Sequence, residues 1–291
     1  MTDEAVRTLL DGFVASVVDV VPVVAIWVHG SLALGDFVPA RSDLDLVCLT
    51  DGPIPDPSAL AKFHRRLMRS SPVGPRLHCT YVPVNALADP SLRHPTFAQR
   101  RYFDRPVGLV ARRELTLADR SLSGPPPSEL LPATSDEDLA AFIRADLGTF
   151  WHPVTTKRLP WYRDIWVDLS LITYARATRT LQSGTLITKR EALALLPELG
   201  APEEVVADIH HRRYGTASEQ VDPQQFFRGR ERERPGGTGW SAGFTPRSLA
   251  AYSPRWRARR AHLTRTYLHT AIPRLLADPT ATGSVDDSRI T

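Results

Sequence analysis

The sequence predicts an α+β protein in which a small mixed-sheet domain is followed by an all-α helical-bundle domain. Short apolar runs rich in β-branched residues concentrate before residue 83, and such runs are typical of buried strands. The proline-rich segment 124–132 (GPPPSELLP) then predicts a linker, because consecutive prolines continue neither a helix nor a central strand. Beyond it the apolar residues recur at helical spacing. We therefore expect domains over residues 1–125 and 133–276, and a disordered tail over 277–291.

The elements of the first domain follow from the period of the apolar residues. Residues 3–20 have helical spacing, which Pro22 interrupts. Residues 23–28, 44–50 and 76–82 are expected to be strands, and a helix over 60–70 connects the last two, after the turn sequence DGPIPDP. Strand, loop, strand, helix and strand describe a mixed sheet, which we expect helices to cover on one side.

The second domain is expected to consist of helices with recognisable ends. Ser135 and Asp138 form a plausible capping pair, Gly184 suits a helix C-terminus, and Thr188 with Glu191 fits a capping box. A polar, glycine-rich stretch over residues 228–243 predicts a surface loop. The expected helices span residues 135–150, 166–183, 188–196, 202–214 and 254–276.

Composition limits the class of protein and its location. Of the 291 residues, 42% are hydrophobic and 23% are charged, as in ordinary globular proteins. No apolar stretch approaches the roughly 20 residues of a membrane span, and the acidic start lacks the features of a secretory signal. Cys48 and Cys79 lie within strand-like runs and suit a reducing compartment. We expect a cytoplasmic monomer with no membrane partner.

The formal net charge of +4 is compatible with phosphate-bearing ligands. It is too small and too dispersed to indicate a nucleic-acid partner. The densest basic segment, residues 255–265 (RWRARRAHLTR), is interpreted as a solvated or interdomain helix face.

Three short motifs occur in order and carry the functional prediction. Gly30-Ser31 follows the first strand, Gly35-Asp36 comes soon after, and Asp43-x-Asp45 opens the next strand. Glycine permits a tight turn close to a ligand, and the Ser31 hydroxyl with nearby backbone N–H groups can bind phosphate oxygens. Asp36 is expected to shape the loop.

The two aspartates of the third motif predict a metal site. Residues i and i+2 of a strand share a face, so Asp43 and Asp45 place two carboxylates side by side. Such carboxylates repel each other unless a cation lies between them, and Mg²⁺ prefers oxygen ligands and also binds nucleotide phosphates. Together with Ser42, which precedes them, these residues predict a nucleotide and metal site for phosphoryl transfer.

The segment HGSLALGDFVPARSDLDL resembles the DNA polymerase β-like nucleotidyltransferase superfamily. Over about residues 23–215 the chain resembles the two-domain aminoglycoside adenylyltransferases that modify streptomycin and spectinomycin. The helical domain of that group carries an arginine, a glycine, a lysine and a tyrosine-glycine, which read here as Arg176, Gly184, Lys189 and Tyr214-Gly215. The resemblance implies that Arg176 and Lys189 contact nucleotide phosphates and that Tyr214 lies at the nucleotide site. The alternatives are an ion pair for Arg176 and an exposed helix start for Lys189.

The resemblance implies an Mg²⁺-dependent enzyme that transfers AMP from ATP, or NMP from another NTP, to a hydroxyl of an aminoglycoside-like molecule, as in antibiotic resistance. A catalytically impaired nucleotide- or ligand-binding regulator on the same scaffold is the alternative. A minimal nucleotidyltransferase antitoxin acting on a protein or tRNA is disfavoured by the large helical domain.

One position departs from the family pattern. The family carries a glutamate on the strand after the crossover helix, in a pattern like LExT, whereas this chain reads Leu77-His78-Cys79-Thr80. Three explanations stay open. His78 acts as the general base, Asp104 or Glu114 replaces the missing acid, or transfer activity is lost.

The acceptor site is expected between the domains, near residues 100–105 and the first helices of the second domain. Aromatic and acidic residues of that region suit a cationic, sugar-like acceptor, although each tryptophan taken singly fits an interdomain core better. These residues are Trp151, Trp161, Tyr162, Asp164, Trp166 and Asp168.

Overall fold

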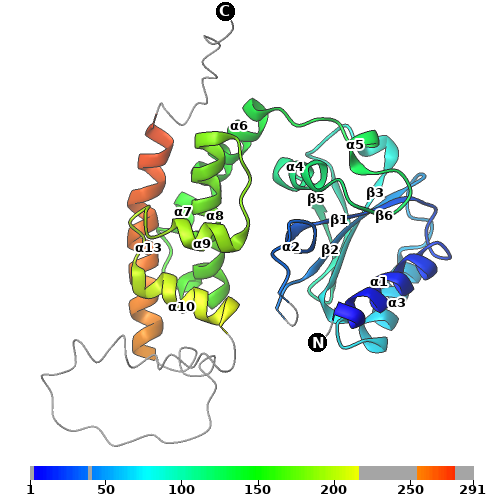
Figure 1. The fold of residues 1–291 in the computed structure, drawn as a ribbon, viewed down its shortest axis with the longest axis horizontal. Coiled ribbons are helices and arrows are strands. Elements are labelled where there is room, and N and C mark those ends of the chain that lie inside the picture. The colour runs from blue at the N-terminus through cyan, green and yellow to red at the C-terminus, as the bar shows by residue number, and fades with distance from the viewer. Residues whose placement is uncertain (1–2, 39–40, 216–253, 279–291) are drawn as a thin grey trace, which may run out of the picture. The chain divides into compact units, whose positions relative to one another are not determined.

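The computed structural model describes residues 3–38, 41–215 and 254–278 (Figure 1). Contacts divide the chain into two compact units, Met1–Leu139 and Ala140–Thr291, and the predicted limits of separate domains stay a prediction. The loop predicted over 228–243 and the tail from residue 279 onward lie outside the described residues. None of the helices in the described ranges combines the length and apolar character that a membrane span requires.

The first unit contains a six-stranded mixed sheet with the strand order β5-β4-β3-β2-β1-β6. Strands β2 and β3 pair in parallel, and the other neighbouring pairs are antiparallel. The three predicted strands therefore form the centre of the sheet. The elements of this unit are α1 (Asp3–Val17), β1 (Val23–His29), α2 (Gly30–Ala33), β2 (Leu44–Thr50), α3 (Pro57–Ser70), η1 (Gly74–Arg76), β3 (Leu77–Pro83), η2 (Val84–Ala86), β4 (Arg93–Ala98), β5 (Arg101–Pro106), α4 (Leu109–Ala118), β6 (Ser121–Ser123) and α5 (Pro127–Leu130).

The crossover helix α3 begins at Pro57, three residues before the predicted start at residue 60. The turn-like sequence DGPIPDP therefore overlaps the first turn of the helix. The Asp56 carboxylate accepts hydrogen bonds of 2.8 and 3.1 Å from the backbone N–H groups of Ser58 and Ala59. Pro57 occupies the first helical position, where its missing N–H costs no intrahelical bond. The sequence DGPIPDP therefore forms a turn and then the N-terminus of α3.

Helices cover both faces of the sheet, so the expectation of one covered side was wrong. On one face Phe13 of α1 and Leu60 of α3 pack with Leu46. On the other face Trp27 and Leu115, which belongs to α4, form a second core cluster. Figure 1 shows α1 and α3 on one side of the sheet and α4 on the other. Helix α4 was not predicted. Its buried side chains are those of Arg112, Glu114 and Leu115, so charged residues interrupt the apolar pattern that would indicate a helix.

The edge hairpin of β4 and β5 was also missed. Its strands read RHPTFA and RYFDRP, and most residues of β5 are exposed. Edge strands tolerate proline and charged side chains, because one side of their backbone is unpaired. No continuous apolar run therefore marks them in the sequence.

The proline-rich segment predicted as a linker packs against the sheet of the first unit. The Trp27 indole N–H donates a 2.8 Å hydrogen bond to the Pro125 carbonyl, and Leu131 is buried in the core cluster of that face. Gly124 has a φ of +72°, and a Cβ there would lie 2.1 Å from the Val24 carbonyl oxygen. Close backbone packing explains why glycine stands at this position.

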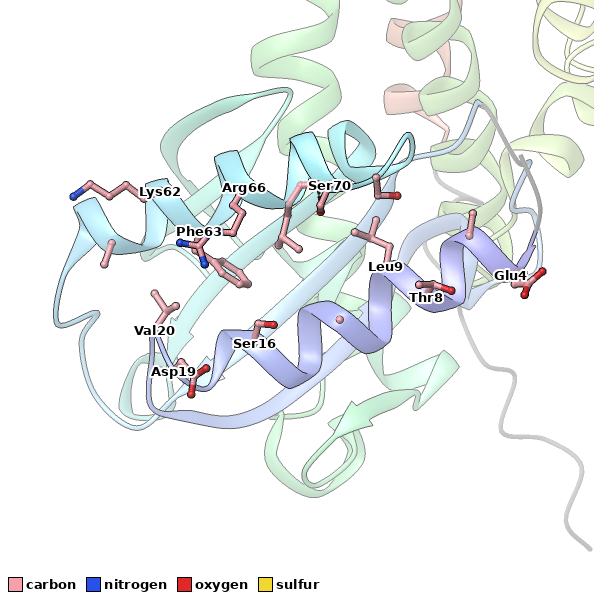
Figure 2. Close-up of a pocket in the computed structure, with 15 residues that line it drawn as sticks. Glu4, Thr8, Leu9, Ser16, Asp19, Val20, Lys62, Phe63, Arg66 and Ser70 are labelled. Carbon is pink, nitrogen blue, oxygen red and sulfur yellow. Dashed lines mark hydrogen bonds between the residues drawn. The ribbon is translucent and has the colours of Figure 1, made fainter.

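A groove with a volume of about 910 Å³ runs between α1 and α3 (Figure 2). Leu9 and Phe63 contribute apolar surface, Gly12 leaves the middle of α1 without a side chain, and Lys62 and Arg66 line the α3 side. Leu9 and Phe63 belong to the core cluster of this face. The groove therefore lies on the sheet face opposite to that of Trp27 and α4.

In the described part of the second unit all regular elements are helical. They are the end of α6 (Asp136–Asp146), the π-helical turn η3 (Leu147–Trp151), α7 (His152–Val154), η4 (Leu159–Tyr162), α8 (Asp164–Ser183), α9 (Lys189–Leu195), α10 (Glu203–Tyr214) and α13 (Pro254–Ala277). The predicted helix ends are confirmed. Ser135 caps α6, Gly184 has a φ of +67° after α8, and Thr188 and Glu191 form a capping box at α9.

Buried ion pairs join the helices of the second unit. Arg212 of α10 donates hydrogen bonds of 2.8 and 2.6 Å to the two carboxylate oxygens of Asp168 on α8. The side chain of Arg260 on α13 is fully buried and pairs with Asp164 and Asp208. The interpretation of residues 255–265 as a solvated or interdomain face is therefore wrong for Arg260, because three carboxylates replace water around these arginines.

Candidate active site

Three polar residues, one on each of β1, β2 and β3, form a row across the sheet of the first unit. His29 at the end of β1 is the register partner of Asp45 on β2, and Asp45 is the register partner of His78 on β3. Register partners point to the same side of a sheet, and here that side is the one covered by α4. Leu44 and Leu46 lie in the opposite core cluster, so the alternation around Asp45 is as predicted.

His78 lies between the two predicted metal ligands. Its Nδ1 is 3.3 Å from Asp45 Oδ1, and its Nε2 is 3.8 Å from Asp43 Oδ1. The Asp43 side chain is 51% exposed and that of Asp45 is 23% exposed, whereas the imidazole is 7% exposed. The two carboxylates therefore stay accessible to a ligand, and the histidine supports them from within the protein.

Gly30 makes room beside Asp45. Its φ is +68°, and a Cβ built there would lie 2.9 Å from Asp45 Oδ2. An L-residue at this position would be strained and would crowd the carboxylate. The glycine of the first motif therefore provides both the turn and the space beside the second aspartate.

The loop between the motifs is held by its own hydrogen bonds. The Asp36 N–H donates to the Ser31 carbonyl at 2.9 Å, and both residues are buried. The loop-shaping role expected of the Asp36 side chain stays a prediction. The Ser42 hydroxyl accepts a 2.9 Å hydrogen bond from the Val38 N–H, and the Ser42 carbonyl accepts one from Arg76. Ser42 thus ties the loop just before Asp43.

The donor set fits a divalent cation that is shared with a nucleotide. In the described ranges no group of three or more His, Cys, Asp or Glu residues is arranged to hold a metal ion by itself. Mg²⁺, however, commonly binds one or two carboxylates and completes its shell with water and substrate phosphates. Asp43 and Asp45 supply two oxygen-bearing groups, and the missing Cβ of Gly30 leaves space beside Asp45 Oδ2.

The structure distinguishes the two acids that the sequence offers in place of the missing glutamate. Asp104 pairs with Pro95 on the edge of the sheet. Two residues along these strands, Phe97 pairs with Tyr102, and Phe97 stacks on His64 of α3. Because Asp104 shares the face of Tyr102, it points away from Asp45.

Glu114 lies on the same side of the sheet as the predicted metal ligands. It is a buried residue of α4, and its Oε2 is 3.7 Å from His29 Nδ1. His29 in turn neighbours Asp45 in the strand register. Of the two candidate acids, only Glu114 therefore belongs to this neighbourhood.

Sequence reasoning missed the turn between β4 and β5, which reaches His78. The Gln99 N–H donates a 3.2 Å hydrogen bond to His78 Nε2. Gln99 and Arg100 have φ values of 52° and 62°, in a two-residue loop whose sequence lacks the usual asparagine or glycine. The positive φ values are visible only in the structure, and the sequence carries no turn signal here.

The three residues of the second unit that are predicted to bind the nucleotide lie on neighbouring helices. Arg176 Nε donates a 2.8 Å hydrogen bond to the Ile187 carbonyl, two residues before Lys189 at the start of α9. The Arg190 guanidinium lies 4.0 Å from the centre of the Tyr214 ring. Contacts of α8, α9 and α10 thus bring Arg176, Lys189 and Tyr214 into one region.

The residues that are predicted to line the acceptor site differ in how far they are exposed to solvent. Trp161 is fully buried, and Trp151 is nearly so. Asp164 and Asp168 pair with arginines. Tyr162 is 47% exposed, and Trp166 stacks near the π-helical turn with Phe150. Their predicted role in binding an acceptor stays a prediction.

The sheet, the Gly-Ser turn and the Asp-x-Asp pair at the start of β2 are features found together in one class of protein, the nucleotidyltransferases. The family model described as nucleotidyltransferase domain matches residues 10–74. This span includes Gly30, Ser31, Asp43 and Asp45 and runs from within α1 to just past α3. Within the first unit, residues 10–74 are therefore similar to a nucleotidyltransferase domain.

Among solved structures, the spectinomycin adenyltransferase from Enterococcus faecialis, crystallised with ATP and spectinomycin, is similar over 91% of this chain and 97% of its own. The TM-score is 0.53 and the sequence identity is 12%. At this identity the likeness shows the fold alone, and it confirms the predicted fold class. No curated protein matches the sequence. The chain resembles the polymerase β-like nucleotidyltransferases and, among them, the aminoglycoside adenylyltransferases.

Proposed function

We propose that the protein is an Mg²⁺-dependent nucleotidyltransferase that moves AMP from ATP to a hydroxyl of a small, aminoglycoside-like molecule. The observation that carries the proposal is the pair Asp43 and Asp45 at the start of β2, beside the open turn at Gly30, within a nucleotidyltransferase domain. A protein of the same fold was crystallised with ATP and spectinomycin. This supports a nucleotide and a small polar acceptor as the two substrates.

In the proposed reaction the acceptor hydroxyl oxygen attacks the α-phosphorus of the nucleotide. The bond from that phosphorus to the bridging oxygen breaks, pyrophosphate leaves with the electron pair, and the hydroxyl proton passes to a base. When bound, Mg²⁺ neutralises charge on the phosphates. Asp43 and Asp45 would hold it.

The other proposed roles concern the phosphates and the proton. Gly30 and Ser31 seat the phosphates, with Ser42 holding the loop, and this assignment rests on the turn geometry described above. Arg176 and Lys189 neutralise phosphate charge and Tyr214 lies at the nucleotide, as the family resemblance implies. Of the two candidate acids, Glu114 is the one on the same side of the sheet as this row, 3.7 Å from His29, and we propose it as the replacement for the missing glutamate.

The proposal is tested by nucleotide-induced stabilisation of the full chain. Mg·ATP at about 100 times its Kd should add about 2.7 kcal/mol to the free energy of unfolding, which raises the melting temperature by several degrees. The double variant Asp43→Asn/Asp45→Asn should lose this shift. Asp104→Asn, which makes the same chemical change on the opposite face, should keep it. An equal response of parent and double variant would refute the site.

A second candidate function is a nucleotide- or ligand-binding protein without transfer activity. The observation that favours it is His78, which stands where the resembling enzymes carry a glutamate. This function predicts stabilisation by Mg·ATP without release of pyrophosphate from any member of a panel of aminoglycosides and other polyhydroxylated amines. Turnover of a single acceptor would exclude it.

A further inference from the structure

His78 is held at both nitrogens of its ring. Its Nδ1 lies 3.3 Å from Asp45 Oδ1. Its Nε2 receives the hydrogen bond of the Gln99 backbone N–H at 3.2 Å and lies farther, 3.8 Å, from Asp43 Oδ1. The residue is 6% exposed, so water does not substitute freely for either contact. Each contact restricts where the imidazole proton can lie.

The contact with Gln99 determines the tautomer. A backbone N–H is only a donor, so the ring nitrogen that it meets has to offer a lone pair. With Nε2 as the acceptor of this hydrogen bond, Nδ1 is the nitrogen that carries the ring proton. Nδ1 is also the ring nitrogen that faces Asp45 Oδ1 at 3.3 Å, which is the place that outer partners of metal ligands occupy.

The turn that supplies this donor is strained. Gln99 and Arg100 both adopt positive φ values, 52° and 62°, between the register partners Ala98 and Arg101. Such values disfavour side chains other than those of glycine, asparagine and aspartate. Backbone strain of this kind persists where the surrounding structure enforces it, often at functional sites. Here the strained residue is the one whose N–H meets His78.

We propose that His78 is a positioning residue, which the β4–β5 turn fixes in its Nδ1–H form so that it orients the Asp45 carboxylate. Because the Nε2 lone pair is occupied by Gln99, the ring does not take the proton of an acceptor hydroxyl. The histidine therefore occupies the sequence position of the missing glutamate as a hydrogen-bond donor to Asp45, and the role of the missing acid stays with Glu114. The inference rests on the proposed function only in treating Asp45 as a metal ligand.

The tautomer is measured directly by long-range ¹H–¹⁵N correlation spectra of the full chain labelled with ¹⁵N-histidine, recorded at pH 8 without nucleotide. His78→Asn identifies the signals of His78 by their loss. We expect the pattern of the Nδ1–H form, with Nε2 as the unprotonated nitrogen. An Nε2–H form or an imidazolium pattern would overturn the proposal.

The positioning role is tested by binding of Mn·ATP, measured by calorimetry. His78→Ala should weaken binding about 10- to 100-fold, as loss of such outer partners commonly does. His78→Asn should restore most of the affinity, because its side-chain amide can donate to Asp45 from the place of Nδ1. Equal loss in both variants, or parent-like binding by His78→Ala, would contradict the positioning role. If the parent binds no Mn·ATP while its spectrum shows the Nδ1–H form, the proposed function fails and the tautomer assignment stands.

Discussion

His64 shows how burial changes the chemistry of one residue in the first unit. Its Nε2 lies 2.7 Å from the Tyr81 hydroxyl oxygen, and its ring stacks on Phe97 with centroids 4.2 Å apart. The residue is 1% exposed. Burial lowers the pKa of His64 to about 3, because the charged ring cannot be solvated there. His64 is therefore a neutral core residue with a specific hydrogen-bond partner.

This lowered pKa predicts a loss of stability in acid. Between pH 6.5 and 3 the unfolded chain binds a proton at His64 that the folded chain does not bind, so the free energy of unfolding falls as the pH decreases. At pH 5 the loss from this residue is about 2 kcal/mol. Urea unfolding of the parent and of His64→Gln at pH 7.5 and pH 5 measures it. The variant should lose less stability between these two pH values, and identical losses would contradict the assignment.

At the scale of the element, helix α1 contains a glycine that its fold does not require. A Cβ at Gly12 would meet nothing within 4 Å, and the residue has no positive φ. It lines the groove between α1 and α3 (Figure 2). Gly12 therefore lowers the stability of the helix without a compensating contact within the described chain.

Gly12→Ala is expected to raise the free energy of unfolding by about 0.5–1 kcal/mol, because alanine loses less backbone entropy in a helix. Chemical denaturation of the purified variant measures this gain. Gly74→Ala is the matched control, since its Cβ would lie 2.2 Å from the Leu67 carbonyl oxygen, and it should destabilise the protein. A loss of stability in Gly12→Ala would show that α1 needs the glycine.

At the scale of the whole molecule, the second unit depends on charges that segments distant in sequence bring together. Arg212, Asp168 and Asp208 lie on α8 and α10, and Arg260 comes from α13. Burial raises the pKa of the Asp168 carboxyl, an effect that the hydrogen bonds from Arg212 oppose. These charges stabilise the unit only as complete pairs.

Arg212→Met is expected to cost about 3–5 kcal/mol, because it leaves the buried carboxylate of Asp168 without its partner. Arg259→Met removes a pair with Glu204 in which the arginine side chain is 46% exposed, and it should cost less than about 1 kcal/mol. Thermal unfolding of the two variants against the parent provides the comparison. Similar costs for both would mean that the buried pair contributes no more than a surface pair.

The sequence by itself determined the order of the central elements, the caps of α6 and α9, the end of α8 and the spacing of the Gly-Ser and Asp-x-Asp motifs. These features depend on neighbours within a few residues, so local patterns are sufficient to reveal them. The family resemblance and the fold class follow from the same local signals.

Only the tertiary structure decided which face of the sheet each side chain occupies and what it meets there. Register across β1, β2 and β3 placed His29, Asp45 and His78 in one row, and the register of β4 with β5 turned Asp104 away from it. The hydrogen bond from Gln99 to His78 likewise joins residues far apart in the chain. The same holds for the ion pair between Arg260 and Asp208. Such contacts arise from the packing of whole elements, and no short sequence pattern encodes them. The spacing of the motifs therefore predicts where a metal and a nucleotide bind, whereas the fold determines how His78 is held beside them.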